Sequence, residues 1–230
     1  MVWDDHETAN DTWREGAQNH QPATEGSFAD REAAASKAYF DYMPIRRPEQ
    51  RDIRIYRTLD WGNLARIVLL DTRLIGRDKQ LDYRTTIAPA VMGGGDIPAA
   101  IAAFRQQLDD PARTIMGQAQ ETWFADALAQ SKSRGQPWQI VAQQIVMEDV
   151  ALPANISSFI NPSLPAQTRQ YVTMGSMASS VGLPWNLDAW GGYPAARTRF
   201  LTACANNANN ALNRIVNFYT PENRRGLLAD

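Results

Sequence analysis

The sequence predicts a layered α/β fold, and two strand-like segments with a helix between them carry this prediction. Residues 64–70 (LARIVLL) and 138–147 (WQIVAQQIVM) are short apolar runs with β-branched residues, which is typical of buried strands. Residues 117–131 (GQAQETWFADALAQS) place Phe124 and Leu128 on one helical face. A strand, a helix and a second strand in this order are typical of an α/β layered domain.

The N-terminal part of the chain is expected to be less regular. Residues 1–35 are polar and show poor periodicity, so we expect irregular chain there, with one helix around residues 30–40. Residues 54–57 (RIYR) precede a turn at Gly62 and the first buried strand. This short run between turn signals predicts a further strand.

Two more helices are predicted from their first residues and their composition. Residues 97–108 (IPAAIAAFRQQL) have Pro98 near their start, followed by good helix formers. Residues 195–205 (AARTRFLTACA) follow Pro194, which suits a first helical position. Residues 149–194 contain five prolines and are expected to be rich in loops.

Composition limits the classes of function. The 230 residues are 44% hydrophobic and carry a formal net charge of −2, which fits one globular domain and gives no sign of a nucleic-acid surface. One cysteine, Cys204, excludes a Cys-based zinc site, and it is expected as a buried apolar residue rather than a nucleophile. No apolar run approaches the ~20 residues of a membrane span. The first residues, MVWDDHETAND, show no signal-peptide pattern.

The segment WDDHE at residues 3–7, followed by Asn10 and Asp11, is the strongest chemical feature. Carboxylates and a histidine at this density repel or perturb one another unless a cation or hydrogen bonds offset the charge. Metal-assisted hydrolysis uses carboxylates to hold cations and a histidine to protonate a leaving oxygen. A polar, solvated surface segment is the alternative explanation of the same residues.

Two further polar sites follow predicted strands. Arg73, in the run LLDTR, could clamp a phosphate because ligands gather at strand ends in open α/β sheets. The alternative is a structural pairing between Asp71 and Arg73. Gln143 and Gln144 could orient a water or a phosphate oxygen, or could simply end a buried strand with polar groups.

An aromatic loop precedes the last predicted helix. Trp185, Trp190 and Tyr193 could wall a substrate cleft or could cover the core beneath a long loop. His20 is expected to be a surface histidine.

Six motifs in order resemble the PhoD-like alkaline phosphatases (alkaline phosphatase D), a branch of the metallophosphoesterase, or calcineurin-like, group. They are WDDHE with ND, AYFDYMPIR, RIYR, LLDTRLIGRD, the WQIVAQQ strand and WNLDAWGGYPAAR. The resemblance implies a partial metallophosphoesterase-type layered α/β sandwich. It also implies a phosphomonoesterase or phosphodiesterase that hydrolyses small phosphate esters with a metal-activated water. The implied metals are calcium with iron, with zinc or manganese as further possibilities.

The resemblance also implies roles for individual residues. Asp5 takes a metal-ligand position and His6 the general-acid position. Asp4 and Asn10 are further metal ligands or support such ligands, and Glu7 forms a hydrogen bond that steadies the loop. Export to the periplasm or the outside is implied as well.

The 230 residues lack two motifs of the family pattern, an upstream GD-x-x-Y and a downstream GD-x-H-x-x-W. We therefore interpret residues 1–205 as the central part of a PhoD-like metallophosphatase domain and residues 206–230 as a divergent C-terminal tail. The alternative function is that of a truncated, catalytically inactive fragment or a binding module.

Overall fold

The computed structural model describes residues 2–46, 54–148, 150–153, 155–207 and 215–217. The chain forms two compact units, each assembled from segments that are distant in sequence. Unit 1 comprises Met1–Lys79, Thr114–Ile145 and Thr198–Asp230, and unit 2 comprises Gln80–Arg113 and Val146–Arg197. The predicted tail, residues 206–230, falls largely outside the described residues, so the boundary at residue 205 stays a prediction.

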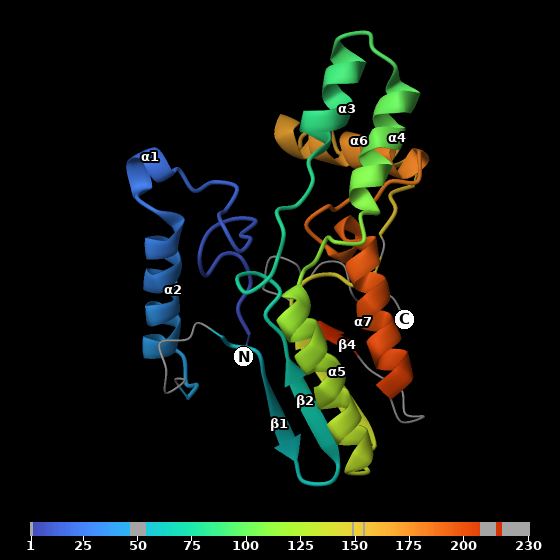
Figure 1. The fold of residues 1–230 in the computed structure, drawn as a ribbon. Helices are drawn as coiled ribbons and strands as arrows, with labels where there is room; N and C mark the ends of the chain where they lie inside the picture. Colours follow the sequence, from blue (N-terminus) through green and yellow to red (C-terminus); the bar gives the residue numbers. More distant parts are fainter. Residues whose placement is uncertain (1, 47–53, 149, 154, 208–214, 218–230) are drawn as a thin grey trace. The chain divides into compact units, whose positions relative to one another are not determined.

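Unit 1 contains a sheet in which the described strands follow the order β1-β2-β3-β4 (Figure 1). Their bounds are Arg57–Trp61 for β1, Ala65–Leu69 for β2, Trp138–Gln143 for β3 and Ile215–Asn217 for β4. β1 and β2 are antiparallel, whereas β3 runs parallel to both β2 and β4. The two buried strands predicted from the apolar runs are therefore present, each shorter than its run.

The strand predicted at residues 54–57 is wrong in position. The observed strand β1 begins at Arg57, opposite Leu69, and ends at Trp61, opposite Ala65. The turn through Gly62, which has a φ of 52°, sets this register. Since pairing extends from the turn and β2 ends at Leu69, residues 54–56 have no strand opposite them in β2.

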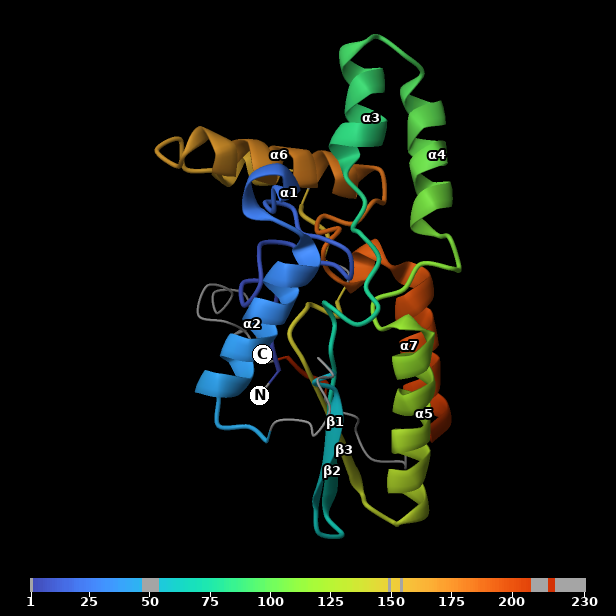
Figure 2. The ribbon, with the colours of Figure 1, turned by 60° about the vertical axis from the view of Figure 1, so that its left-hand side comes forward.

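Helices lie on both sides of this sheet. Figures 1 and 2 show α5 (Gly117–Ser133) on one side and α2 (Phe28–Tyr42) on the other. Arg66 Nη1 donates to the Ala127 carbonyl at 3.0 Å and so joins β2 to α5. The connection between the parallel strands β2 and β3 ends with α5, so this helix forms part of the crossover that parallel pairing requires. The predicted layered α/β fold is confirmed.

The C-terminal part of α7 (Pro194–Asn207) completes the packing on α5. The ring of Phe124 in α5 stacks on that of Phe200, with centroids 4.7 Å apart and an interplanar angle of 10°. Cys204 is buried on the same helix, as the sequence predicted.

The N-terminal segment packs on α2 through a small hydrophobic cluster. Trp3, Phe28, Tyr39, Ile55 and Leu74 are its large members. The ring of Trp3 meets that of Tyr39 edge-on at a centroid separation of 5.1 Å. The residues just before Asp4 are therefore held by α2.

The surface position predicted for His20 is wrong. Its side chain is only 2% exposed, its Nδ1 lies 3.3 Å from Glu25 Oε2, and its ring meets Phe28 edge-on. The short helix α1 (Pro22–Glu25) brings the Glu25 carboxylate back to His20, and Phe28 of α2 covers the ring. This fold-back involves residues whose spacing shows no apolar periodicity, so the sequence pattern did not reveal it.

Unit 2 contains a helical hairpin of α3 (Tyr83–Met92) and α4 (Ile97–Leu108). Asp96 caps α4 by accepting a hydrogen bond from the Ala99 N–H at 2.9 Å. The remaining elements of unit 2 are η1 (Ile156–Phe159), α6 (Ala166–Ser180) and η2 (Trp190–Gly192).

The expectation that residues 149–194 are loop-rich misses helix α6. The buried residues of α6 are small ones, Gly175, Ser176 and Ala178, so the helix shows no large apolar stripe. Gly175 is required because a Cβ there would lie 2.0 Å from Trp185 Cδ1.

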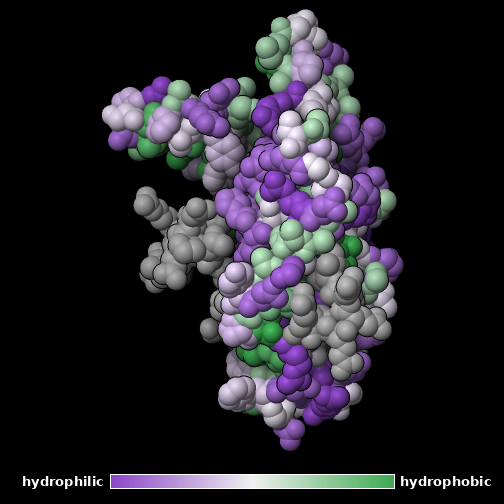
Figure 3. Space-filling view, turned by 90° about the vertical axis from the view of Figure 1, so that its left-hand side faces the viewer, coloured by the Kyte–Doolittle hydropathy of each residue, from purple (hydrophilic) through white to green (hydrophobic). Residues whose placement is uncertain are grey.

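In the part of the chain that the structure describes, no helix is both long and apolar enough to cross a membrane. The face in Figure 3 is mostly hydrophilic, with strongly hydrophobic residues confined to small patches.

A charge pair on the first hairpin generates a stability prediction. Asp60 Oδ1 and Oδ2 accept from Arg66 Nε and Nη2 at 2.7 and 3.0 Å, and the Arg66 side chain is only 3% exposed. These hydrogen bonds from Arg66 lower the pKa of Asp60 to about 2. Asp60→Asn should lower the free energy of unfolding at pH 7 by about 2 kcal/mol, because it leaves a buried guanidinium without its counter-charge. Urea unfolding would measure the loss.

The pH dependence of this stability loss tests whether the Asp60–Arg66 ion pair causes it. Because the folded-state pKa of Asp60 lies below its ordinary value, its stabilisation is present above that ordinary value and disappears as the pH falls toward 2. The difference in the free energy of unfolding between the original chain and Asp60→Asn should shrink as the pH falls over this range. The exposed control variant Asp109→Asn should show no such difference from the original chain. A constant difference down to pH 2 would contradict the ion-pair explanation.

Cys204 provides a built-in reporter of folding. Burial raises the pKa of its thiol to about 12, so thiolate is scarce in the folded chain. We expect an aromatic disulfide reagent at pH 8 to label native Cys204 at least about 100-fold more slowly than the urea-unfolded chain. Equal rates in the two states would contradict the burial of this side chain.

Candidate functional site

The candidate site begins with a tight loop that immediately follows the buried ring of Trp3. The Asp4 N–H donates to Glu7 Oε2 at 2.8 Å, so Glu7 closes the loop as expected. The Asp5 carbonyl accepts from the N–H groups of Thr8 and Ala9 at 2.9 and 2.8 Å. The loop is therefore organised by its own hydrogen bonds.

The carboxylate of Asp5 also takes part in this local structure. Its Oδ2 accepts from the Asp11 N–H at 2.8 Å. Asp11 has a φ of 50°, a left-handed conformation that aspartate tolerates better than most residues. This turn points the Asp11 N–H back toward the carboxylate of Asp5. Asp5 as a whole residue is only 9% exposed.

His6 lies next to two of the predicted metal ligands. Its Nε2 is 3.0 Å from Asn10 Oδ1 and 3.7 Å from Asp5 Oδ2. The Asn10 side-chain amide donates to Gln18 Oε1, which leaves Oδ1 directed at the imidazole. The His6 side chain is 59% exposed, so this edge of the loop meets solvent.

Arg73 joins the loop from the segment after β2. Its Nε and Nη2 both lie 2.8 Å from Asp4 Oδ1, and Nη2 lies 3.8 Å from Asp5 Oδ1. The Arg73 side chain is 3% exposed. The alternative to a phosphate clamp was a structural pairing of Asp71 and Arg73; the guanidinium reaches Asp4, and its charge also acts on the Asp71 carboxyl.

Asp71 supports Arg73 through the backbone. Asp71 Oδ1 accepts from the N–H groups of Arg73 and Leu74 at 2.8 and 3.0 Å. Burial raises the pKa of the Asp71 carboxyl, and these two hydrogen bonds oppose the rise. The indole of Trp3 also lowers the pKa of this carboxyl and so opposes the effect of burial.

Gln120 is a contributor that the sequence analysis missed. Its side chain accepts from the Asp71 N–H at 2.9 Å and donates to the Asp71 carbonyl at 2.8 Å. The sequence feature that could have indicated this role is the position of Gln120 on the helical face that also carries Phe124 and Leu128. An amide on a buried face needs specific hydrogen-bond partners.

The structure therefore brings all five predicted site residues into one network within unit 1. They are linked in the order Asn10, His6, Asp5, Arg73 and Asp4. The two carboxylates carry negative charge into a largely buried place, and the guanidinium offsets it.

The donor set matches the chemistry of hard metal ions in part. Carboxylate and amide oxygens suit calcium and other hard cations, and the loop already accommodates one positive charge beside Asp4. Within the described ranges, however, no group of three or more His, Cys, Asp or Glu converges as a metal site would. Asp4, Asp5 and Asn10 place side-chain oxygens on this loop, and the carboxylates of Asp4 and Asp5 lie beside the Arg73 guanidinium.

The two glutamines after β3 are buried. Gln144 Oε1 accepts from the Thr72 hydroxyl at 3.3 Å, which links the ends of β2 and β3. Gln143 is completely buried. These positions match the structural alternative, in which polar side chains end a buried strand.

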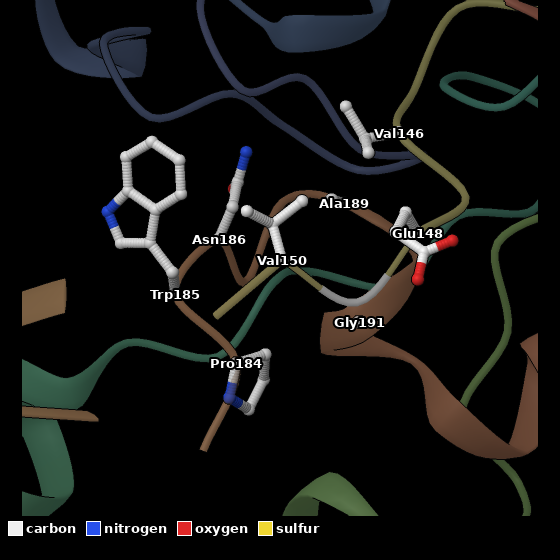
Figure 4. Close-up of a pocket in the computed structure, with 8 residues that line it drawn as sticks. All are labelled: Val146, Glu148, Val150, Pro184, Trp185, Asn186, Ala189 and Gly191. Carbon is white, nitrogen blue, oxygen red and sulfur yellow. The ribbon is translucent and has the colours of Figure 1, made fainter. Parts of the chain in front are cut away.

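The aromatic loop belongs to unit 2, and its rings have different environments. Trp190 and Tyr193 are fully buried, which matches the core-covering alternative. Trp185 is half-buried and lines a pocket (Figure 4). The other residues that line it are Val146, Glu148, Val150, Pro184, Asn186, Ala189 and Gly191.

Comparisons with known proteins agree with the motifs. Residues 1–215 match the family model of the PhoD-like phosphatases. The chain is 29% identical over 216 residues to alkaline phosphatase D of Bacillus subtilis (strain 168), covering 92% of this chain and 29% of that protein. It is also similar to a solved structure described as the structure of PhoD, with a TM-score of 0.57, 26% identity, and coverage of 91% of this chain and 32% of that one.

This chain thus spans less than a third of the length of these two relatives. The structural similarity is consistent with a layered α/β phosphoesterase fold, and the family inferred from the six motifs is confirmed. On the match over residues 1–215, the chain belongs to the PhoD-like phosphatase family.

Proposed function

We propose that this chain carries part of the active site of a metal-dependent phosphoesterase. The observation that supports the proposal is the network of Asp4, Asp5, His6, Asn10 and Arg73, since one loop and one strand end bring together acid, base and cationic groups. The substrate class would be small phosphate monoesters or diesters. Whether monoesters or diesters are preferred would be set by these residues together with any further metal ligands.

Asp5, Asp4 and Asn10 would hold the metal, with calcium and iron as the first candidates and zinc or manganese as others. When bound, such a cation neutralises phosphate charge and lowers the pKa of a coordinated water toward neutrality. Glu7 and Asp11 would keep the carboxylates in place through the hydrogen bonds of the loop.

His6 would donate a proton to the oxygen of the leaving alcohol. The ring is exposed on the side of the loop that meets solvent, and Asn10 Oδ1 orients its Nε2 edge. Histidine suits this role because its ordinary pKa lies near the working pH of most enzymes. Arg73 would neutralise phosphate charge, a role considered further below.

A catalytically inactive binding module is the competing proposal. The family model and both relatives carry phosphatase or PhoD names, so the comparisons give it no support. Export from the cytoplasm, implied by the family resemblance, remains a further proposal that fractionation of expressing cells would test.

The proton-donor role predicts a dependence on the leaving group. His6→Ala should lower the hydrolysis of phenyl phosphate by about 100-fold, because phenolate is a poor leaving group without a proton. The loss on p-nitrophenyl phosphate should be much smaller, since p-nitrophenolate leaves readily. Steady-state rates for both substrates at pH 7 would be measured with calcium and iron present.

Glu15→Ala, an exposed change on the same segment, should leave both rates unchanged. Equal losses on the two substrates would exclude His6 as the proton donor. A complete absence of metal-dependent activity in the original chain would favour the inactive module instead.

Metal binding predicts a second outcome that does not require activity. Asp5→Asn keeps an oxygen that can accept from the Asp11 N–H, yet removes the negative charge that a cation needs. We expect the affinity for calcium, iron, manganese or zinc, each titrated calorimetrically, to fall at least about tenfold. Asp109→Asn is the matched control. Equal metal affinities of Asp5→Asn and Asp109→Asn would show that Asp5 is not a metal ligand.

A further inference from the structure

Arg73 holds the same carboxylate oxygen that a metal ion would need. Both Nε and Nη2 lie 2.8 Å from Asp4 Oδ1, and Nη2 is also 3.8 Å from Asp5 Oδ1. The three side chains are 3%, 11% and 12% exposed, so water screens these charges weakly. A guanidinium and a metal ion at this distance from one oxygen would repel each other strongly.

The position of the Arg73 backbone does not depend on this contact. The Arg73 N–H is held by Asp71 Oδ1, and Asp71 is tied in turn to Gln120 of α5. Rotation of the side chain away from Asp4 would therefore leave the turn after β2 held by Asp71 and Gln120. Such an exchange changes the partner of the guanidinium without unfolding the site.

We propose that Arg73 is a built-in counter-ion that the metal displaces, and that the displaced guanidinium then binds the phosphate group. The inference rests on the proposed function and adds the order of events at that site. A guanidinium forms bidentate hydrogen bonds with phosphate oxygens, so phosphate would compete with Asp4 for Arg73. Phosphate binding would thereby release Asp4 for the metal.

Positive coupling between metal and phosphate is the consequence. If bound phosphate raises the affinity for the metal by some factor, bound metal must raise the affinity for phosphate by the same factor, because linkage is reciprocal. An arginine that stayed on Asp4 would add nothing to the direct attraction between metal and phosphate, and the metal would then use Asp5 and Asn10 without Asp4.

Calorimetric titration of the 230-residue chain with calcium, with and without phenylphosphonate, tests the proposal. Phenylphosphonate carries a phosphate-like headgroup on a carbon–phosphorus bond and is not a phosphate ester. In the original chain it should tighten calcium binding by about fivefold or more. Arg73→Gln should bind calcium about tenfold more tightly without phenylphosphonate, and the tightening by phenylphosphonate should then be smaller than in the original chain, since only the direct attraction between calcium and phosphonate is left.

Arg84→Gln is the matched control, because it removes the same charge from an exposed arginine that pairs with Asp82. Its calcium affinity and its response to phenylphosphonate should equal those of the original chain. Arg73→Lys covers the case in which the glutamine variant does not fold, as judged by Cys204 labelling. A lysine keeps a cation on Asp4 but lacks the bidentate fork, so calcium affinity should change little and the coupling should weaken.

Calcium affinity that is equal or lower in Arg73→Gln would overturn the proposal, and so would a phenylphosphonate effect as large in that variant as in the original chain. In either case the proposed metal site would stand. Absence of calcium binding in the original chain and in all variants would contradict the metal site itself, which separates failure of the proposed function from failure of this inference.

Discussion

The turn that follows β2 depends on the buried carboxyl group of Asp71. One oxygen of this group accepts the N–H groups of Arg73 and Leu74, and the backbone of Asp71 is paired on both sides with the amide of Gln120. Strand, helix and turn are thereby locked together at one point. Burial raises the pKa of this carboxyl, so the hydrogen bonds to it must offset a desolvation cost.

Arg73 carries the effect of this turn to the N-terminal loop. The guanidinium reaches Asp4 from a backbone that Asp71 has already fixed, while Trp3 anchors the other side of the loop against Tyr39. Burial also raises the pKa of Tyr39 to about 12, in line with the 6% exposure of this residue. The charges of the loop are thus held against an apolar support, where an opposite charge has most effect.

The two units are packed with residues of different size. Unit 1 uses large rings and aliphatic strands, such as the stacked pair of Phe124 and Phe200. In unit 2 the helix α6 buries small residues and receives Trp185 at Gly175. A helix that buries small residues lacks the apolar stripe on which helix prediction depends, which explains why α6 was missed.

Local pattern and composition were sufficient for the layered α/β class, for β2, β3, α4 and α5, and for the identity of the residues that form the network. For the strands and helices they were sufficient because burial on a strand or a helix face leaves a periodic trace in the sequence. For the network they were sufficient because polar residues are concentrated between residues 3 and 10 and Arg73 follows a buried strand. The register of β1, the burial of His20 and the partner of Arg73 were decided only by the tertiary structure. Each depends on groups brought together across a turn or across 69 positions, as between Asp4 and Arg73, and no short-range pattern records such contacts.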